Sequence, residues 1–542
     1  MKAYLRKQLA KAIEGFELEE APEIQIEKPR QPEHGDAATN LAMTLAKTLR
    51  QSPRSIAETI VERFEYDEDK IKSVEVAGPG FINFRFAQTY LYDQLADILS
   101  QPENFGKNTN LSGERVLVEF VSANPTGPLT VGHGRNAVLG DTIARLMEWC
   151  GAEVEREYYF NDAGRQMRKL GESVRVRYLQ EIGENVELPE DAYQGQYIIE
   201  IAKLLVQDQG EALKESDVLT PFTKKAEEQI FKDINETLER MSISMDSFFN
   251  EHNLYENGAI DKVLEKLKAA GYLYDAEGAT WFKTTEFGKE KDTVLVKSTG
   301  EPTYRLPDIA YHANKLDREF TRCIDVFGAD HIDTYPDVIN GVKALGYDTS
   351  PVDVVVYQFV TIVNEGKPYK MSTRKAQFVT LDELMDEVGA DVTRFFFLMR
   401  SPGTHLEFDI AEAKEAGEKN PVFYLQYAHA RIHSILRKVT EAHELEESPD
   451  LSPLTHPAEL QLIKTLLDLL EVVSSAAGHK EPHRLINYLN ELAANFTQFY
   501  HDCRILGTEP EVLQARASLA KAVAHGLANG LGILGINAPE RM

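Results

Sequence analysis

Cysteine is scarce in this sequence. Among 542 residues there are three cysteines, Cys150, Cys323 and Cys503, and no two of them form a Cys-x-x-Cys pair. An odd number of widely separated cysteines indicates neither a disulfide framework nor a zinc site built from thiolates. We therefore expect buried or incidental thiols, no protein-bound zinc and no other metal held by the chain.

Long apolar runs are missing as well. No run approaches the ~18 to 20 residues of a membrane-spanning helix, and the opening MKAYLRK leads into no signal-peptide core. The sequence therefore predicts a cytoplasmic protein without a membrane partner. Its length of 542 residues exceeds what one hydrophobic core usually serves, so we expect several domains.

Basic residues are also few relative to acidic ones. The chain carries 59 basic and 87 acidic residues, a net charge of −28, which is the wrong sign for a protein that binds nucleic acid through its overall charge. Two local basic clusters could still contact phosphates, one within 165–177 and one within 431–438. Either cluster could instead be a solvated helix face, which is the commoner arrangement.

What the sequence does contain divides it into three units. Residues 1–110 mix helical and strand-like segments and end in a polar, turn-rich linker, which predicts a small α+β domain. In residues 111–400, strands alternate with helices, which predicts a doubly wound nucleotide-binding sheet of the Rossmann type, with a helical insertion at about 166–290. The sheet is expected to resume at 293–296, 323–331 and 352–363. Residues 401–542 show only helical spacing and predict an all-α helical bundle, so the fold class is α/β and multidomain.

One segment, 116–141, predicts a strand, a turn and a helix in that order. It reads VLVEFVSANPTGPLTVGHGRNAVLGD, and the apolar residues that follow His133 recur at helical spacing. This arrangement places free backbone N–H groups and a positive helix end at the carboxyl edge of a parallel sheet, where phosphates bind. A lone Gly-x-Gly is about as compatible with an ordinary strand–helix unit, because such short motifs often occur by chance.

A second segment, 367–375, is a basic loop that reads KPYKMSTRK and follows a β-rich run. Together the two segments resemble the signatures of class I aminoacyl-tRNA synthetases, the HIGH motif as TVGH at 130–133 and the KMSKS motif as KMSTR at 370–374. Further segments narrow the resemblance to arginyl-tRNA synthetases and stand in the expected order: EYYFNDAGRQM, YLQYAHARI and the closing PERM.

The resemblance implies an activity and a set of residues for it. ATP, as its Mg²⁺ complex, would activate L-arginine to arginyl-adenylate, and the arginyl group would pass to the 3′ end of tRNA(Arg). The catalytic residues implied are His133, Lys370 and Lys375. The ATP-binding residues implied are Thr130, Gly132, His133, Lys370, Met371 and Ser372.

Two positions depart from the family pattern. Thr130 stands where the first histidine of the HIGH motif is usual, so a phosphate contact there has to come from a shorter hydroxyl. Thr373 stands where the second lysine of KMSKS belongs, and Arg374 or Lys375 would have to replace it.

Recognition of arginine requires acceptors, because the guanidinium presents five N–H donors in a planar fork. The resemblance places the following residues around that substrate: Glu119, Ser122, Asn124, Tyr304, Asp308 and Asp330. Glu119 alone would more often be a structural strand-end carboxylate. Three acidic residues from separate strand ends are harder to explain that way, because those ends converge on one crevice.

For tRNA, the resemblance implies that the first domain contacts the elbow through Phe81 and Asn83. The helical bundle would bind the anticodon, with Tyr424, Tyr427 and Arg431 as candidates. The two tyrosines could instead be core residues at the domain junction. We expect the chain to act as a monomer.

Two other functions are compatible with the sequence. One is a catalytically silent relative that only binds tRNA. The other is a different class I synthetase, such as the cysteinyl or methionyl type. Those enzymes would be expected to show cysteine-rich zinc or substrate sites, which three scattered cysteines do not provide.

Overall fold

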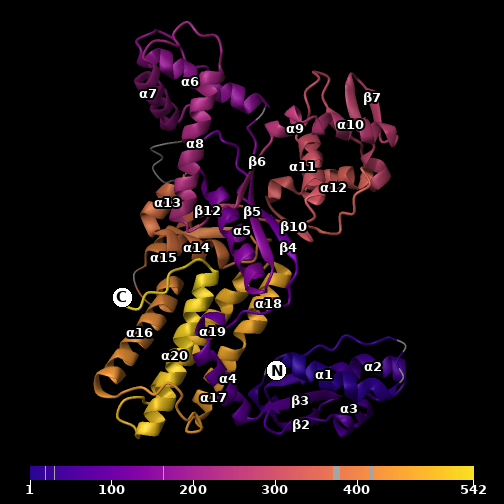
Figure 1. The fold of residues 1–542 in the computed structure, drawn as a ribbon, viewed down its shortest axis with the longest axis vertical. Coiled ribbons are helices and arrows are strands. Elements are labelled where there is room, and N and C mark those ends of the chain that lie inside the picture. Colours follow the sequence, from indigo (N-terminus) through magenta and orange to yellow (C-terminus); the bar gives the residue numbers. More distant parts are fainter. Residues whose placement is uncertain are drawn as a thin grey trace.

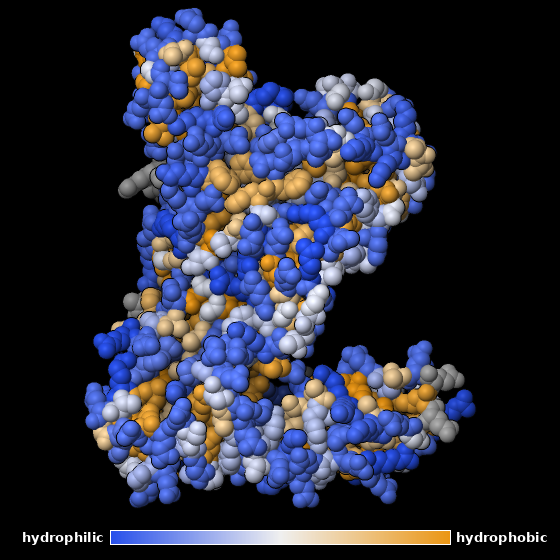
Figure 2. Space-filling view, in the orientation of Figure 1, coloured by the Kyte–Doolittle hydropathy of each residue, from blue (hydrophilic) through white to orange (hydrophobic). Residues whose placement is uncertain are grey.

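The computed structural model describes all residues of the chain except 17, 19, 30, 163, 370–378, 416 and 418. A central sheet with helices on both faces joins a long helical bundle, and a small N-terminal module lies beside the lower part of that bundle (Figure 1). Hydrophilic residues cover most of the face shown in Figure 2, as expected for a chain with a net charge of −28. No helix among the described residues is long and apolar enough to cross a membrane.

The N-terminal module has its own hydrophobic core. Its antiparallel sheet has the order β1-β3-β2, with β1 at Ala37–Thr39, β2 at Ile71–Ala77 and β3 at Phe81–Phe86. Helices α2 (Leu41–Leu49) and α3 (Pro53–Arg63) pack on it, and α1 (Lys2–Ile13) packs on α3. Ser52 caps α3 by accepting a hydrogen bond from the Ser55 N–H at 3.2 Å. The predicted α+β domain is therefore confirmed.

The central sheet is parallel and has the order β11-β10-β4-β5-β6. Its strands are β4 (Arg115–Glu119), β5 (Glu153–Phe160), β6 (Ser247–Asn250), β10 (Arg322–Gly328) and β11 (Val352–Tyr357). Val116, Leu117 and Val118 of β4 are all fully buried, because helices cover both faces of the sheet. Helix α5 (Val131–Trp149) connects β4 to β5. The doubly wound sheet is confirmed.

The segment expected as one helical insertion is helical only in its first part. Helices α6 (Gly164–Glu181), α7 (Gln196–Gln209) and α8 (Thr220–Arg240) project from the sheet (Figure 1). The chain then returns to the sheet as its edge strand β6, and continues through α9 (His252–Glu256) and α10 (Ala259–Ala269). A separate antiparallel sheet follows, with β7 (Leu273–Ala276), β8 (Ala279–Phe282) and β9 (Thr293–Val296). The expectation that 293–296 continues the main sheet was therefore wrong.

The β-rich run 352–363 also divides between two sheets. Strand β11 ends at Tyr357, and β12 (Val360–Asn364) pairs instead with β13 (Lys367–Pro368) and, in parallel, with β14 (Leu406–Asp409). Helices α14 (Ala390–Leu398) and α15 (Ile410–Lys414) pack on this small sheet, and α13 (Leu381–Val388) packs on both helices. Strand β14 lies beyond residue 400 and pairs with β12, which precedes residue 400. The chain therefore returns to the small sheet before the helical bundle begins.

The C-terminal part is helical, as predicted. Its helices are α16 (Pro421–Ala442), α17 (Pro457–Leu467), α18 (Leu469–His479), α19 (His483–Asp502) and α20 (Pro510–Ile533). Helix α4 (Gln88–Ser100) packs against α17 and α20. One continuous core extends from the central sheet into the bundle. The buried Arg394 ties the two together, because it donates to the Leu534 carbonyl at 2.8 Å and to Asp141 at 2.6 Å.

Candidate active site

A cavity of about 470 Å³ opens at the carboxyl ends of β4, β5 and β10, beside the first turn of α5. The structure brings seven of the sequence-predicted residues to its wall: Glu119, Ser122, Asn124, His133, Tyr304, Asp308 and Asp330. A crevice at the carboxyl ends of parallel strands is the usual ligand site of a doubly wound sheet.

The turn after β4 is strained and firmly held. Val121 and Ser122 have φ angles of 65° and 42°, in the left-handed region that non-glycine residues rarely adopt. Asn136 of α5 holds this turn, because its Oδ1 accepts from the Val121 N–H at 2.6 Å and its Nδ2 donates to the Val326 carbonyl of β10 at 2.8 Å. The end of β4, with Glu119, is thereby fixed against the neighbouring strand.

His133 lies in the first turn of α5 and closes a capping box with Thr130. The Thr130 N–H donates to Nδ1 of His133 at 3.1 Å, and the Thr130 hydroxyl accepts from the His133 N–H at 3.4 Å. Burial lowers the pKa of His133, and Asp330 partly opposes that effect. A neutral ring whose Nδ1 accepts must carry its hydrogen on Nε2. His133 is therefore both a cap and a donor available to the cavity.

Neither Thr130 nor Gly132 of the same turn lines the cavity. The Thr130 hydroxyl is engaged in the cap, and Thr130 does not line the cavity. A Cβ added at Gly132 would meet only the Thr130 hydroxyl, at 3.7 Å, so the space beside this glycine is open. A ligand can approach the backbone closely at such a position.

Two acidic side chains form the floor of the cavity. Glu119 is 4% exposed, and its Oε1 accepts from the Ser122 hydroxyl at 2.9 Å. Asp308 comes from the first turn of α11 (Arg305–Asp317), not from a strand end as the sequence suggested. Burial, with further contributions from Glu119 and Glu251, raises the pKa of Asp308 to about 7 against the lowering effect of His312 and Lys315. A cation that enters the cavity would restore the charge of this carboxyl group.

Glu251 is an acidic residue that sequence reasoning missed. It is 6% exposed, directly follows β6, and accepts from the Tyr159 hydroxyl at 2.9 Å. Burial raises its pKa, and it is close enough to raise that of Asp308. Recognition of β6 inside the supposed helical insertion would have placed Glu251 at a strand end facing the same crevice.

The other predicted residues lie at the rim. Tyr304 is 66% exposed, and Asn124 donates to the Gln166 side chain at 2.7 Å. Asp330 lies in the short helical turn Ala329–His331 after β10, where its side chain is 63% exposed and 3.7 Å from Nε2 of His331. The cavity thus has an acidic floor and a more open polar rim.

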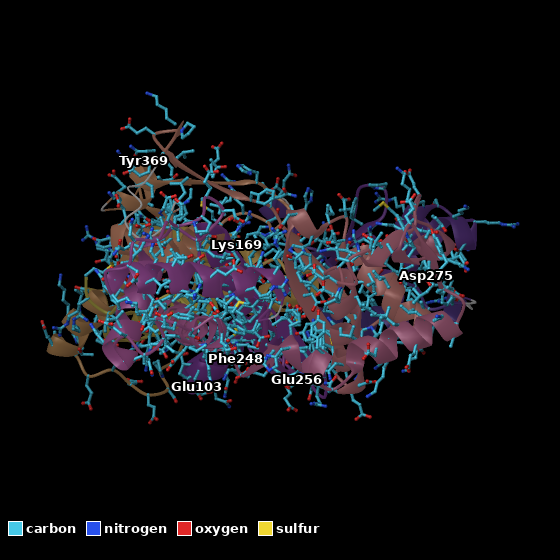
Figure 3. All side chains as sticks on the ribbon, turned by 90° about the horizontal axis from the view of Figure 1, so that it is seen from above. Glu103, Lys169, Phe248, Glu256, Asp275 and Tyr369 are labelled. Atoms are coloured by element: carbon cyan, nitrogen blue, oxygen red, sulfur yellow. The ribbon has the colours of Figure 1, made fainter. Side chains whose placement is uncertain are left out.

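Lys370, Met371, Ser372 and Lys375 lie outside the described residues. The described ends of their loop are anchored. Tyr369, at the outer edge of the molecule in Figure 3, donates its N–H to the Ile362 carbonyl at 3.0 Å. On the other side, the Leu381 N–H donates to the Leu129 carbonyl at 2.8 Å, and Thr380 forms a β-bridge with Thr130. The loop therefore ends beside the turn that carries His133.

Three family models match successive parts of the chain: "Arginyl tRNA synthetase N terminal domain" over 3–86, "tRNA synthetases class I (R), catalytic domain" over 94–395 and "DALR anticodon binding domain" over 425–542. A curated relative from Salinibacter ruber, named arginine–tRNA ligase, is 55% identical over 562 residues and covers 100% of both chains. The chain belongs to the arginyl-tRNA synthetase family. A relative of the same name from Desulfotalea psychrophila is 49% identical over 95% of this synthetase and 94% of its own length.

A solved structure supports the fold. Thermus thermophilus arginyl-tRNA synthetase superposes on this class I synthetase with a TM-score of 0.80 over 100% of both chains, at 24% identity. The arrangement of a doubly wound sheet, an N-terminal module and a helical bundle is therefore that of its family.

The predicted tRNA contacts lie away from the cavity of the synthetase. Phe81 is 40% exposed at the start of β3, where Asn83 lies two residues further along. On α16, Tyr427 is 45% exposed and so is not a core residue, whereas Tyr424 is partly buried against the core. Arg431 stacks over the Tyr500 ring at 4.9 Å.

The basic cluster at 165–177 is largely neutralised. Arg168 pairs with Glu301 at 3.2 Å, Lys169 with Asp191 at 2.5 Å, and Arg175 with Asp217 at 3.3 Å. These pairs favour a solvated helix face over a continuous positive track for phosphates.

Proposed function

We propose that the chain is an arginine–tRNA ligase whose substrates meet in the cavity at the end of β4. A carboxylate oxygen of arginine attacks the α-phosphorus of ATP, and the bond to pyrophosphate breaks. A hydroxyl of the terminal tRNA ribose then attacks the carbonyl carbon of arginyl-adenylate, and AMP leaves. Membership of the family supports the reaction; the geometry of the cavity supports the assignment of residues.

The acidic floor is the observation that carries the proposal. Glu119 and Asp308 line the cavity, and Glu251 is close enough to Asp308 to raise its pKa. A planar guanidinium together with an α-ammonium group requires several acceptors. We assign Glu119, Ser122, Asn124, Tyr304, Asp308 and Asp330 to arginine, and we add Glu251 as a support of Asp308. A pocket of this charge would disfavour the apolar or thiol side chains that related class I synthetases select.

ATP is assigned to the opposite side of the cavity, at the first turn of α5. Phosphate oxygens can accept from the Nε2 hydrogen of His133 and can approach the positive end of the helix. The open space beside Gly132 leaves room for them. Acceleration of such a transfer depends mainly on positioning and on neutralisation of charge. Lys370, with Lys375 in place of the missing second lysine, would supply cations from the loop, with Met371 and Ser372 beside them. Mg²⁺ would enter with ATP and bridge its phosphates.

The remaining parts are assigned to tRNA. Phe81 and Asn83 of residues 1–110 would contact the elbow, while Tyr427, Tyr424 and Arg431 of residues 401–542 would contact unpaired anticodon bases, which stack well on aromatic side chains. Residues 111–400 would carry the chemistry. The chain is still expected to act as a monomer, and the reaction supports a cytoplasmic location, where tRNA is charged for protein synthesis.

The test is aminoacylation of total tRNA by the purified full-length chain. Radiolabelled arginine should be transferred and labelled lysine should not, because a single ammonium cannot span acceptors arranged for a planar fork. Transfer of another amino acid would contradict the acidic-floor assignment. Binding of tRNA without any charging would support the silent relative instead.

A further inference from the structure

Three acidic side chains lie in a row across the central sheet, directly beneath the cavity. The strand register pairs Asp325 of β10 with Glu119 of β4, and Glu119 with Glu157 of β5. Their side chains are 0%, 5% and 1% exposed, respectively. Like charges at directly opposed positions repel each other, and buried charges are stable only with partners. The sheet therefore needs cations at this level.

Helix α11 supplies them from the layer that covers the sheet. Lys315, whose side chain is 0% exposed, contacts Oε2 of Glu119 and lies 2.6 Å from Oδ1 of Asp325. Burial alone would lower the pKa of Lys315, but Asp325 and Glu119 outweigh it and raise the pKa. One turn later, Arg318 bonds both oxygens of Glu157, at 2.6 and 2.7 Å. Each acidic residue of the row thus has a cation from α11 or from its C-cap residue.

The same helix carries Asp308 into the cavity. Positions 308, 312 and 315 follow helical spacing and share one face of α11. His312 links them, because its Nδ1 lies 2.8 Å from the Asp308 carbonyl and its Nε2 lies 2.9 Å from Oδ2 of Asp325. The position of Asp308 therefore depends on how α11 is docked on the acidic row.

We propose that Lys315 is a positioning residue for arginine. It does not line the cavity itself. It contacts Oε2 of Glu119, which leaves Oε1, bonded to Ser122, on the side of the cavity, and it fixes α11 in the register that brings Asp308 to the same space. This inference rests on the proposed function, namely that the cavity binds arginine.

Arg318 provides a matched control. It forms a cation–carboxylate pair like that of Lys315, from the residue that directly follows the same helix and against the same row, but its partner Glu157 does not line the cavity. Lys315→Met should therefore raise the KM for arginine about tenfold or more, which is typical of a lost coupling between contacting residues, and leave the KM for ATP nearly unchanged. Arg318→Met should lower the melting temperature and change the arginine KM little. Lys315→Arg keeps the charge and should recover part of the loss.

A double-mutant cycle with Glu119→Gln tests whether Lys315 affects arginine binding through Glu119. If Lys315 acts through Glu119, the losses of arginine affinity from Lys315→Met and Glu119→Gln will not add in the double variant. If Lys315→Met does not fold, Lys315→Met combined with Asp325→Asn removes one carboxylate with the cation and should give the same loss in a folded protein.

Some results would overturn the inference. An unchanged arginine KM in a folded Lys315 variant, or an equal rise in Arg318→Met, would reduce Lys315 to a structural residue. These outcomes are distinct from failure of the proposed function, because in that case the unaltered chain would already fail to charge tRNA with arginine.

Discussion

Asp308→Asn should make the empty protein more stable and its arginine binding weaker. The pKa of Asp308 is raised from 3.8 to about 7 in the folded protein. Because the folded state binds this proton more tightly than the unfolded state, the folded state loses stability as the pH rises from about 4 to about 7. At about 1.4 kcal/mol per pKa unit, the charged carboxylate costs up to about 4 kcal/mol at pH 8. The amide removes that cost.

Arginine binding should respond in the opposite direction. Loss of the charge-assisted hydrogen bonds, together with an uncompensated guanidinium in a partly dry pocket, costs about 3 to 5 kcal/mol. The KM for arginine should rise at least about 100-fold, while that for ATP should hardly change. Lysine should remain a poor substrate of both proteins.

The assay combines thermal melts at pH 6 and pH 8 with steady-state kinetics in the presence of tRNA. Asp317→Asn is the control, because Asp317 is an exposed carboxylate of the same helix, bonded to the Tyr347 hydroxyl at 3.0 Å. A lower melting temperature of Asp308→Asn at pH 8 would refute the raised pKa. Equal rises in the KM values for arginine and ATP would indicate that Asp308 contacts the nucleotide. An unchanged KM for both would indicate that Asp308 has only a structural role.

Three further predictions follow from the same geometry. His133→Ala should raise the activation barrier by about 3 to 4 kcal/mol and leave the affinity for tRNA unchanged. His133→Asn keeps an acceptor for Thr130 and an N–H donor, so its activation rate should fall less. Equal losses in activation rate and tRNA affinity would contradict this role of His133. The affinity for arginine, measured by calorimetry, should rise about tenfold from pH 6 to pH 8, because Asp308 must be ionised to bind a cation and its pKa is about 7. An affinity that does not change with pH would contradict the role of Asp308. Tyr427→Ala, at a residue 45% exposed, should leave the melting temperature unchanged and weaken discrimination of anticodon variants by about 1 to 3 kcal/mol; unfolding would show that the ring belongs to the core.

The local parts of the fold were predictable because their signals are local. The strand, turn and helix around His133 could be recognised from periodicity and turn formers, and β4 and α5 lie there. The acidic pocket could be anticipated in part, since ends of parallel strands meet. Glu119 lies at such an end.

The predictions that were wrong or incomplete concern features that depend on tertiary contacts. Strand β6 has four residues, too few to show a period, and so Glu251 was missed with it. The run 352–363 has one continuous β propensity, yet the chain changes sheets between Tyr357 and Val360. The role of α11 was hidden as well, because its buried face carries His312 and Lys315, which without the acidic row resemble solvent-exposed residues.

The central claim is that this cavity activates arginine with ATP, and ATP–pyrophosphate exchange measures that step most directly. With the purified full-length chain and tRNA present, exchange should require arginine and should be nearly abolished in His133→Ala. Exchange that does not depend on arginine, or no exchange under any of these conditions by a folded protein that still binds tRNA, would contradict the account.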